Sequence, residues 1–386
     1  MSDDFERAKD LFLWNKRAFN IIGIWPLERS YIKFPFWIIY LLIHFSFEMV
    51  DLYYVIGNLE QMVLNLSEST LTIMVMLKIT VLRFSKVLKN LMIQILDSID
   101  DKFFDDPEEK KIYLRYNQIA KSFFKMWTTM AVFGAIAYYM KPLEFRIKAA
   151  LGNGSQPFPI SYRTRFFFEI NDSRTFWIVW LCQSPMILGQ SIHAMSIGFL
   201  FSMILHVCGK LSVLSYRIKV LGLELRENPE KSQLLFRGII ETHCDIIGIT
   251  KDIDSVFNLL LLEELFVSTV IVGLSAYTVL VTADVSVSGE FFTFFVYSMT
   301  MLFLLNGYCI AGEYLITESI NVYDAYYQCQ WYELTNSAKK QLMICMIRAM
   351  KPMQLTGGGF YIFCLATFTD VLKTIMGYIS MLRTII

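Results

Sequence analysis

The sequence has little charge: only 18% of its 386 residues are Asp, Glu, Lys or Arg, against about 25% in ordinary soluble domains. Lys plus Arg and Asp plus Glu both number 35, so the net charge is zero, and the basic surface typical of nucleic-acid binding is missing. The lack of repeats and low-complexity tracts excludes solenoid, collagen-like and disordered classes. Apolar residues are abundant instead, at 55% with a mean hydropathy of +0.45. These features predict an integral membrane protein that binds no nucleic acid.

Motifs for catalysis and metal binding are also missing. The four histidines form no HExxH pair, and the seven cysteines form no CxxC or Cys/His pattern. The sequence contains no GxSxG, GxxxxGK[ST] or GxGxxG motif. We therefore expect no enzymatic activity, no cofactor and no metal ion.

Seven apolar windows approach the roughly 20 residues that a helix needs to cross a bilayer. They cover residues 34–56, 64–82, 123–140, 176–206, 259–281, 291–311 and 357–382. The second is the weakest because it contains Glu68 and Lys78. The sequence predicts an all-α integral membrane protein, with residues 1–386 forming a single seven-transmembrane domain. Segments 86–121, 211–257 and 338–350 carry apolar residues at helical spacing, and we expect them to form a cytosolic helical anchor region.

The basic residues lie mainly on one side of this topology. Of the 35 Lys and Arg residues, 26 fall in the segments on the side of the N-terminus and 6 in the loops on the other side. The positive-inside rule then places the N-terminus in the cytosol and the C-terminus outside. Three N-glycosylation sequons begin at Asn65, Asn153 and Asn171, all in segments expected to be outside.

Polar residues cluster in the fourth window around Pro185, which should kink that helix. They are Gln183, Ser184, Gln190, Ser191 and His193. Two interpretations stay open: the residues border an internal cavity, or they form hydrogen bonds between helices. The side chains of Tyr138, Trp180, Met186 and Tyr277 are candidates to line an apolar ligand pocket, with ordinary packing as the alternative.

The last window has one marked face. Thr367, Asp370, Thr374, Tyr378, Met381 and Ile385 recur every three or four residues, and this spacing puts them on one side of a helix. A stripe that is polar and then apolar suits a helix lining a water-filled path that closes at a hydrophobic constriction. The alternative is a helix packed in its own bundle, with Asp370 or Lys373 paired across an interface. Gly357, Gly358 and Gly359 precede this helix and indicate a hinge.

The C-terminal block resembles the most recognisable stretch of the insect odorant receptors. It reads Lys351-Pro352-Met353-Gln354-Leu355-Thr356-Gly357-Gly358-Gly359-Phe360, then Thr367-Phe368, Val371 to Thr374, Tyr378 and Met381-Leu382-Arg383. Gly23-Ile24-Trp25-Pro26 and the Tyr139 to Pro142 segment are also similar to that family. The resemblance covers essentially the whole chain.

The resemblance implies an odorant-gated, non-selective cation channel, assembled as a heterotetramer with a co-receptor subunit in the plasma membrane of sensory dendrites. The last helix would line the pore, with Met381 and Ile385 at an outer hydrophobic gate and Thr384 beside it. A small volatile ligand would bind in the outer half of the bundle, which favours Tyr138, Met186 and Tyr277. The 211–257 segment is shorter than in the co-receptor, which points to a tuning subunit.

Three other classes of membrane protein are alternatives to this function. A G-protein-coupled receptor would have the opposite orientation, an outer disulfide, a DRY-like motif and an NPxxY motif, and all of these are absent from the sequence. A transporter would show inverted repeats or paired interrupted helices, whereas only the fourth window is interrupted. A gustatory-receptor-like channel is the closest alternative, because only ligand polarity and co-receptor dependence separate it from an odorant receptor.

Overall fold

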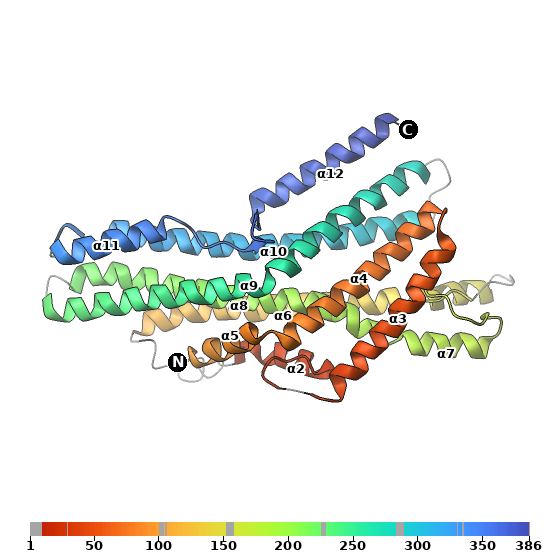
Figure 1. Cartoon of the computed structure of the whole chain (residues 1–386), viewed down its shortest axis with the longest axis horizontal. Coiled ribbons are helices and arrows are strands. Elements are labelled where there is room, and N and C mark those ends of the chain that lie inside the picture. Colours follow the sequence, from red (N-terminus) through yellow and green to blue (C-terminus); the bar gives the residue numbers. More distant parts are fainter. Residues whose placement is uncertain are drawn as a thin grey trace.

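The computed structural model describes residues 10–28, 30–99, 104, 106–151, 158–224, 229–282, 289–329, 331–333 and 336–385. Most of these residues are helical (Figure 1). The elements are η1 (Asp10–Phe12), α2 (Leu13–Ile22), α3 (Lys33–Val55), α4 (Leu59–Phe84), α5 (Lys86–Asp97), α6 (Pro107–Leu151), α7 (Ser173–Gln183), α8 (Met186–Glu224), α9 (Pro229–Thr282), α10 (Gly289–Gln328), η3 (Trp331–Glu333), α11 (Asn336–Ala349), β1 (Thr356–Gly357), β2 (Tyr361–Ile362) and α12 (Leu365–Ile385).

Several helices are long and apolar enough to cross a membrane. By length and composition, five such segments lie in the described part of the chain: Lys33–Val55, Glu60–Phe84, Ser173–Leu221, Leu235–Ala276 and Phe295–Gln328. Helix α6 contains the third predicted window, and α12 contains the last one from Leu365 onward. The predicted class, an all-helical membrane protein, is confirmed.

The helices extend well beyond the apolar windows. Helix α6 joins much of the predicted 86–121 segment to the third window without a break, and α8 and α9 continue likewise through much of the 211–257 segment. Among the described residues of the three segments, α5 and α11 are the separate helices, and the rest of the anchor region consists largely of extensions of the membrane helices. Hydropathy detects the part of a helix that suits lipid, whereas the helix itself continues as long as its backbone is paired and one face is packed.

The two ends of the molecule's long axis hold different connections (Figure 1). Helix α11 and the facing ends of α8 and α9 gather at one end. The turn between α3 and α4, the facing ends of α9 and α10, and the C-terminal end of α12 lie at the other. The connections predicted to be cytosolic and those predicted to be outside therefore occupy opposite ends.

Helix α8 is the centre of the bundle and packs mainly on α6 and α10. Glycines allow close contact there: a Cβ on Gly198 would lie 2.7 Å from the Phe124 ring. The N-terminal segment also packs on α8, because the rings of Phe19 and Trp25 lie 5.3 and 6.0 Å from that of Phe199. Gly23 ends α2 in the left-handed conformation, with φ of 79°.

The predicted helix start at residue 357 is wrong. Residues 356–362 form a short antiparallel hairpin in which Thr356 pairs with Ile362 and Gly357 with Tyr361. Gly358 and Gly359 turn the chain with φ of 63° and 79°, a region that favours glycine. Helix α12 begins only at Leu365. We call residues 353–364, which contain this hairpin, the clip.

Candidate functional site

Helix α12 has one packed face and one exposed face. It packs mainly on α9 and α10, against which Val371 and Ile375 are buried. The predicted stripe lies on the exposed side: Asp370 and Thr374 are exposed, and Tyr378 and Met381 are 57% and 60% exposed. Figure 1 shows α12 leaving the bundle at an angle. Most of the residues expected to line a pore are therefore left uncovered by the chain itself.

Thr367 lies at the start of the predicted stripe, and its hydroxyl forms hydrogen bonds with residues that precede α12. The hydroxyl of Thr367 accepts a hydrogen bond from the Cys364 backbone N–H at 3.1 Å and donates one to the Ile362 carbonyl at 2.7 Å. Thr367 therefore caps the start of α12. The side chains of Thr384 and Ile385 lie outside the described part of the structure. Asp370 and Lys373 were alternatively expected to pair across an interface. They form an ion pair with each other instead, with Lys373 Nζ 3.1 Å from Asp370 Oδ1 on the same helix.

The clip is attached to α9 by polar contacts. Asp254 Oδ1 accepts hydrogen bonds from the Thr356 backbone N–H at 2.7 Å and from the Thr356 hydroxyl at 3.0 Å. The Gly358 N–H donates to the Asn258 carbonyl at 2.9 Å. These bonds fix both the first strand and the glycine turn.

The clip is attached to α10 even more closely. A Cβ on Gly312 would lie 1.9 Å from the Phe363 carbonyl oxygen, so only glycine allows this approach. The next residue, Glu313, accepts a hydrogen bond from the Leu365 N–H at 3.1 Å through Oε2. A carboxylate at this position pairs a free N–H and stabilises the positive end of the helix dipole of α12. The direction in which α12 leaves the bundle is thus set by α9, α10 and the clip.

The clip contacts predict an effect on stability. Replacing Asp254 with alanine removes a charged acceptor and leaves the Thr356 N–H without a partner, which costs about 1.5–3 kcal/mol for a hydrogen bond to a charged group. We expect the detergent-purified protein to melt a few degrees lower, measured by its loss of monodispersity on heating. Asp252→Ala, on the same helix but away from the clip, should melt like the unsubstituted protein. Equal melting of the two variants would show that the bond contributes nothing.

Two of the candidate ligand residues, Tyr138 and Trp180, have different neighbours. The Tyr138 hydroxyl donates a hydrogen bond to the Glu68 carboxylate, and its ring lies 5.7 Å from that of Tyr162. Glu68 also accepts from the Arg163 N–H at 2.6 Å. Trp180 instead stacks on Tyr139 at 4.5 Å. Tyr138 and Trp180 thus belong to different contact groups.

The helix is interrupted at Ser184 and Pro185, between α7 and α8, where the sequence predicts a kink. Met186 is buried at the start of α8. The amide of Gln183 donates to the Tyr162 carbonyl at 3.1 Å and to the Thr164 hydroxyl at 2.9 Å. This polar side chain therefore holds the loop before α7 in place. The side chain of Tyr277 lies outside the described part of the structure.

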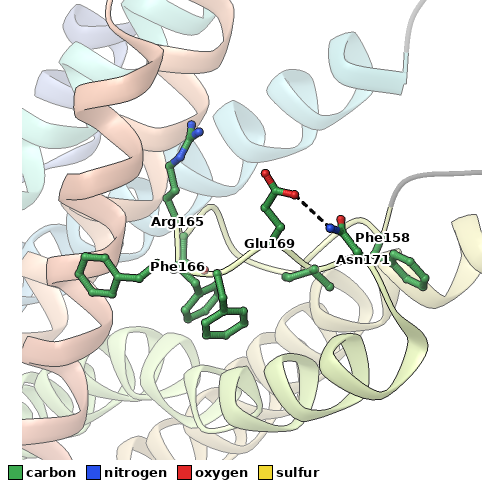
Figure 2. A pocket seen from close by; sticks show the side chains of 9 residues that line it. Phe158, Arg165, Phe166, Glu169 and Asn171 are labelled. Carbon is green, nitrogen blue, oxygen red and sulfur yellow. Dashed lines mark hydrogen bonds between the residues drawn. The ribbon is translucent and has the colours of Figure 1, made fainter.

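That loop lines an open pocket of about 590 Å³ beside the start of α7 (Figure 2). Phe158 and residues 164–171 line it, and Asn171 donates a hydrogen bond to Glu169 at 3.0 Å. The Arg165 N–H donates to the Phe47 carbonyl at 3.2 Å, so α3 holds the loop. Of the candidate ligand residues whose side chains the structure describes, Tyr138, Trp180 and Met186 lie outside this pocket.

The sequons have different surroundings. Asn65 is fully buried in α4, and its amide donates to the Glu48 carbonyl at 3.0 Å and to Asp51 at 2.9 Å. A glycan on Asn65 is incompatible with this packing, which corrects that expectation. Asn171 is exposed just before α7. The Asp172 side chain caps α7, and its hydrogen bond with Thr175 lowers the pKa of the Asp172 carboxyl. Asn153 lies outside the described residues.

A buried charged cluster was only partly evident in the sequence. Lys78 Nζ lies 2.7 Å from Glu264 Oε2, 3.0 Å from His193 Nδ1 and 3.3 Å from the Tyr308 hydroxyl. Lys78 and His193 stood out as polar residues in apolar windows, whereas Glu264 and Tyr308 did not. Only the packing of four helices brings these side chains together. In the described part of the chain, no group of three or more His, Cys, Asp or Glu side chains could hold a metal ion.

The fold is that of a helical membrane protein. Its last helix leaves the bundle at an angle, and the clip attaches the start of that helix to α9 and α10. The model of the 7tm odorant receptor family matches residues 58–376, and the chain belongs to this family. It is therefore a receptor-family protein and not an enzyme.

Individual relatives agree with this assignment. The chain is 25% identical to odorant receptor 13a of Drosophila melanogaster over 283 residues, which cover 68% of this chain and 66% of that receptor. It is 29% identical to the odorant receptor coreceptor of Aedes aegypti over 158 residues, 40% of this chain and 32% of that protein. These alignments thus span less than two thirds of either relative. The fold is similar to that of the insect olfactory receptor OR5 from Machilis hrabei, with a TM-score of 0.76, 14% identity, and coverage of 98% and 100% of the two chains.

Proposed function

We propose that this chain is an odorant-binding subunit of a ligand-gated, non-selective cation channel. The observation that carries the proposal is the exposed stripe of α12, polar at Asp370 and Thr374 and then apolar at Met381, on a helix whose other face is packed. A side-by-side arrangement of such helices around an axis would line a path for cations that closes at an apolar ring. Family membership supports the same function.

The proposed orientation places the N-terminus in the cytosol and the C-terminus outside, in the plasma membrane. It is supported by the excess of Lys and Arg on one side. The separation of the two groups of connections along the long axis agrees with it (Figure 1). On the family resemblance, we place the protein in the dendrites of sensory neurons.

The proposed ligand is a small apolar volatile, bound in the outer half of the bundle near Tyr138, Trp180, Met186 and Tyr277. The similar OR5 protein has also been solved in complex with eugenol, with a TM-score of 0.72 to this chain. Burying about 200 Å² of such a ligand contributes roughly 5 kcal/mol, before the cost of association. We therefore expect micromolar or weaker affinity, and a ligand that opens the channel must bind the open state more tightly than the closed one.

The proposed partner is an odorant co-receptor subunit, in a heterotetramer. The sequence similarity to the Aedes aegypti coreceptor supports a shared mode of assembly, and the short 211–257 segment favours the tuning role. The hinge role of Gly357, Gly358 and Gly359 remains a prediction, and the clip gives these residues a defined place in front of the pore helix.

Whole-cell recording tests the proposed function. Cells expressing this chain with a co-receptor should give a fast cation current during a panel of volatiles, and cells expressing either chain alone should give a much smaller current or none. The current should persist when G-protein signalling is blocked. A response that the blocker abolishes would contradict the channel function.

Glycosylation gives an independent test of the orientation. We expect Asn171 to carry a glycan, because it is exposed in a loop proposed to lie outside. The unsubstituted protein should lose apparent mass when treated with an endoglycosidase, and Asn171→Gln should reduce this shift by one glycan. Asn65→Gln should leave the shift unchanged. An Asn171→Gln protein with the full shift would contradict this assignment.

A further inference from the structure

The Lys78 cluster, comprising Lys78, His193, Glu264 and Tyr308, joins four helices. Its members come from α4, α8, α9 and α10 in that order, and they are 1%, 2%, 0% and 4% exposed. An ammonium group has three N–H donors, and Lys78 Nζ has three acceptors at 2.7, 3.0 and 3.3 Å, each on a different helix. The buried charge is thus fully paired.

Histidine completes the cluster. An ammonium cannot accept a hydrogen bond, so His193 Nδ1 must be the acceptor and the ring proton sits on Nε2. Nε2 lies 3.4 Å from Glu264 Oε1. Glu264 therefore faces both Lys78 and His193, and the three side chains form a closed ring of contacts between α4, α8 and α9.

Burying charged side chains inside a membrane bundle costs free energy, because the charges lose their hydration. Apolar side chains of similar volume pack at least as well as a buried ion pair, and charges inside membrane proteins usually have a functional role. An ion pair differs from apolar packing in that it holds one defined geometry. A shift of one helix that breaks the contacts leaves charges buried without partners.

The cluster also borders the clip. The Tyr308 ring lies edge-on to the Phe363 ring, with centroids 6.1 Å apart, and the Phe363 carbonyl is the group that rests on Gly312. On α9, Leu262 lies two residues before Glu264, and it is the residue against which Gly357 and Gly358 pack. The same short stretches of α9 and α10 thus contact both Lys78 and the clip.

We propose that the Lys78 cluster positions the part of α9 and α10 that holds the clip, and so couples movements of α4 and α8 to the pore helix α12. The coupling rests on the proposed channel function, whereas the positioning of the clip does not. Lys78 and Glu264 act through other residues and are positioning residues.

The test uses the double variant K78M/E264M, which removes both charges and approximately keeps the side-chain volume. The single variant K78M leaves Glu264 buried without its cation. We expect the amount of this variant at the cell surface, called the surface amount below, to fall several-fold. In the double variant the surface amount should return to within about twofold of the unsubstituted protein. The matched control is E109M/R217M, which removes another ion pair, at 2.7 Å, that joins α6 to α8.

Hydrogen exchange and ligand-evoked current are then measured for K78M/E264M and for its control. Hydrogen exchange of the purified chain should show amides of the clip, such as those of Gly358 and Phe363, exchanging at least about tenfold faster in K78M/E264M than in the control. In cells with the co-receptor, the eugenol concentration for half-maximal current should rise at least about fivefold. Eugenol is the probe in this assay, beside the other volatiles of the panel.

The outcomes separate the two proposals. Clip exchange that is unchanged in K78M/E264M at normal surface amount would overturn the positioning role, and the cluster would then only pack the bundle. Faster clip exchange with an unchanged half-maximal concentration would overturn the coupling. If the unsubstituted chain gave no current with any volatile while clip exchange rose as expected, the positioning role would stand and the channel function would be contradicted.

Discussion

Gly312→Ala is expected to abolish most of the ligand-evoked current. The added Cβ would lie 1.9 Å from the Phe363 carbonyl oxygen, and this backbone atom cannot rotate away as a side chain can. The clip would have to move off α10, breaking the bond between Glu313 and the start of α12. Overpacking of this kind costs about 1–3 kcal/mol. If this cost falls on the coupling between ligand binding and pore opening, the evoked current should decrease about 5- to 150-fold. Whole-cell current normalised to surface amount measures the effect.

Gly238→Ala is the matched control for that variant. Gly238 also lies within a long helix, α9, but a Cβ there would meet nothing within 4 Å. Because alanine favours helices over glycine by about 1 kcal/mol, this variant should reach the surface and conduct normally. If Gly312→Ala conducted as well as Gly238→Ala, the clip would not determine the position of the pore helix.

Met381→Ser is expected to raise the current that flows without ligand. If Met381 is buried in an apolar constriction of the closed channel, replacing it with serine destabilises the closed state by about 1.5–3 kcal/mol per subunit. A change of this size shifts the closed-to-open ratio about tenfold or more. Resting current at equal surface amount is the measurement, made with the co-receptor present.

The control for the gate is Met376→Ser on the same helix. Met376 is 64% exposed, similar to Met381 at 60%, but it lies outside the predicted stripe. We expect its resting current to match that of the unsubstituted channel. An unchanged leak in Met381→Ser, or an equal rise in both variants, would argue against a gate at Met381.

The sequence predicted the features that depend on one helix at a time. Apolar windows located the membrane helices, and the residues picked out by the three- and four-residue spacing from Asp370 to Met381 all lie on the exposed part of α12. The predicted start of the last helix was wrong because hydropathy cannot distinguish a short apolar hairpin from the first turns of a helix. Three consecutive glycines are compatible with either, and only the contact with Gly312 and Asp254 decides between them.

Features that depend on several helices could not be predicted. Lys78 and His193 were visible as polar residues in apolar windows, but Glu264 became their partner only through the relative register of α4, α8 and α9. The different neighbours of Tyr138 and Trp180 could not be predicted for the same reason. Tyr138 and Tyr139 are adjacent in the sequence, yet they point to different neighbours, because successive residues of a helix lie about 100° apart.

Cysteine accessibility along α12 tests the central claim most directly. Single cysteines at positions 370, 371, 374, 375 and 378, in a background with the exposed Cys182 and Cys244 replaced by serine, would be treated with a charged, membrane-impermeant thiol reagent during evoked current. A pore lined by the exposed stripe predicts block at 370, 374 and 378 and none at 371 and 375. Block without this helical pattern, or no block at any position, would contradict a pore formed by the last helix.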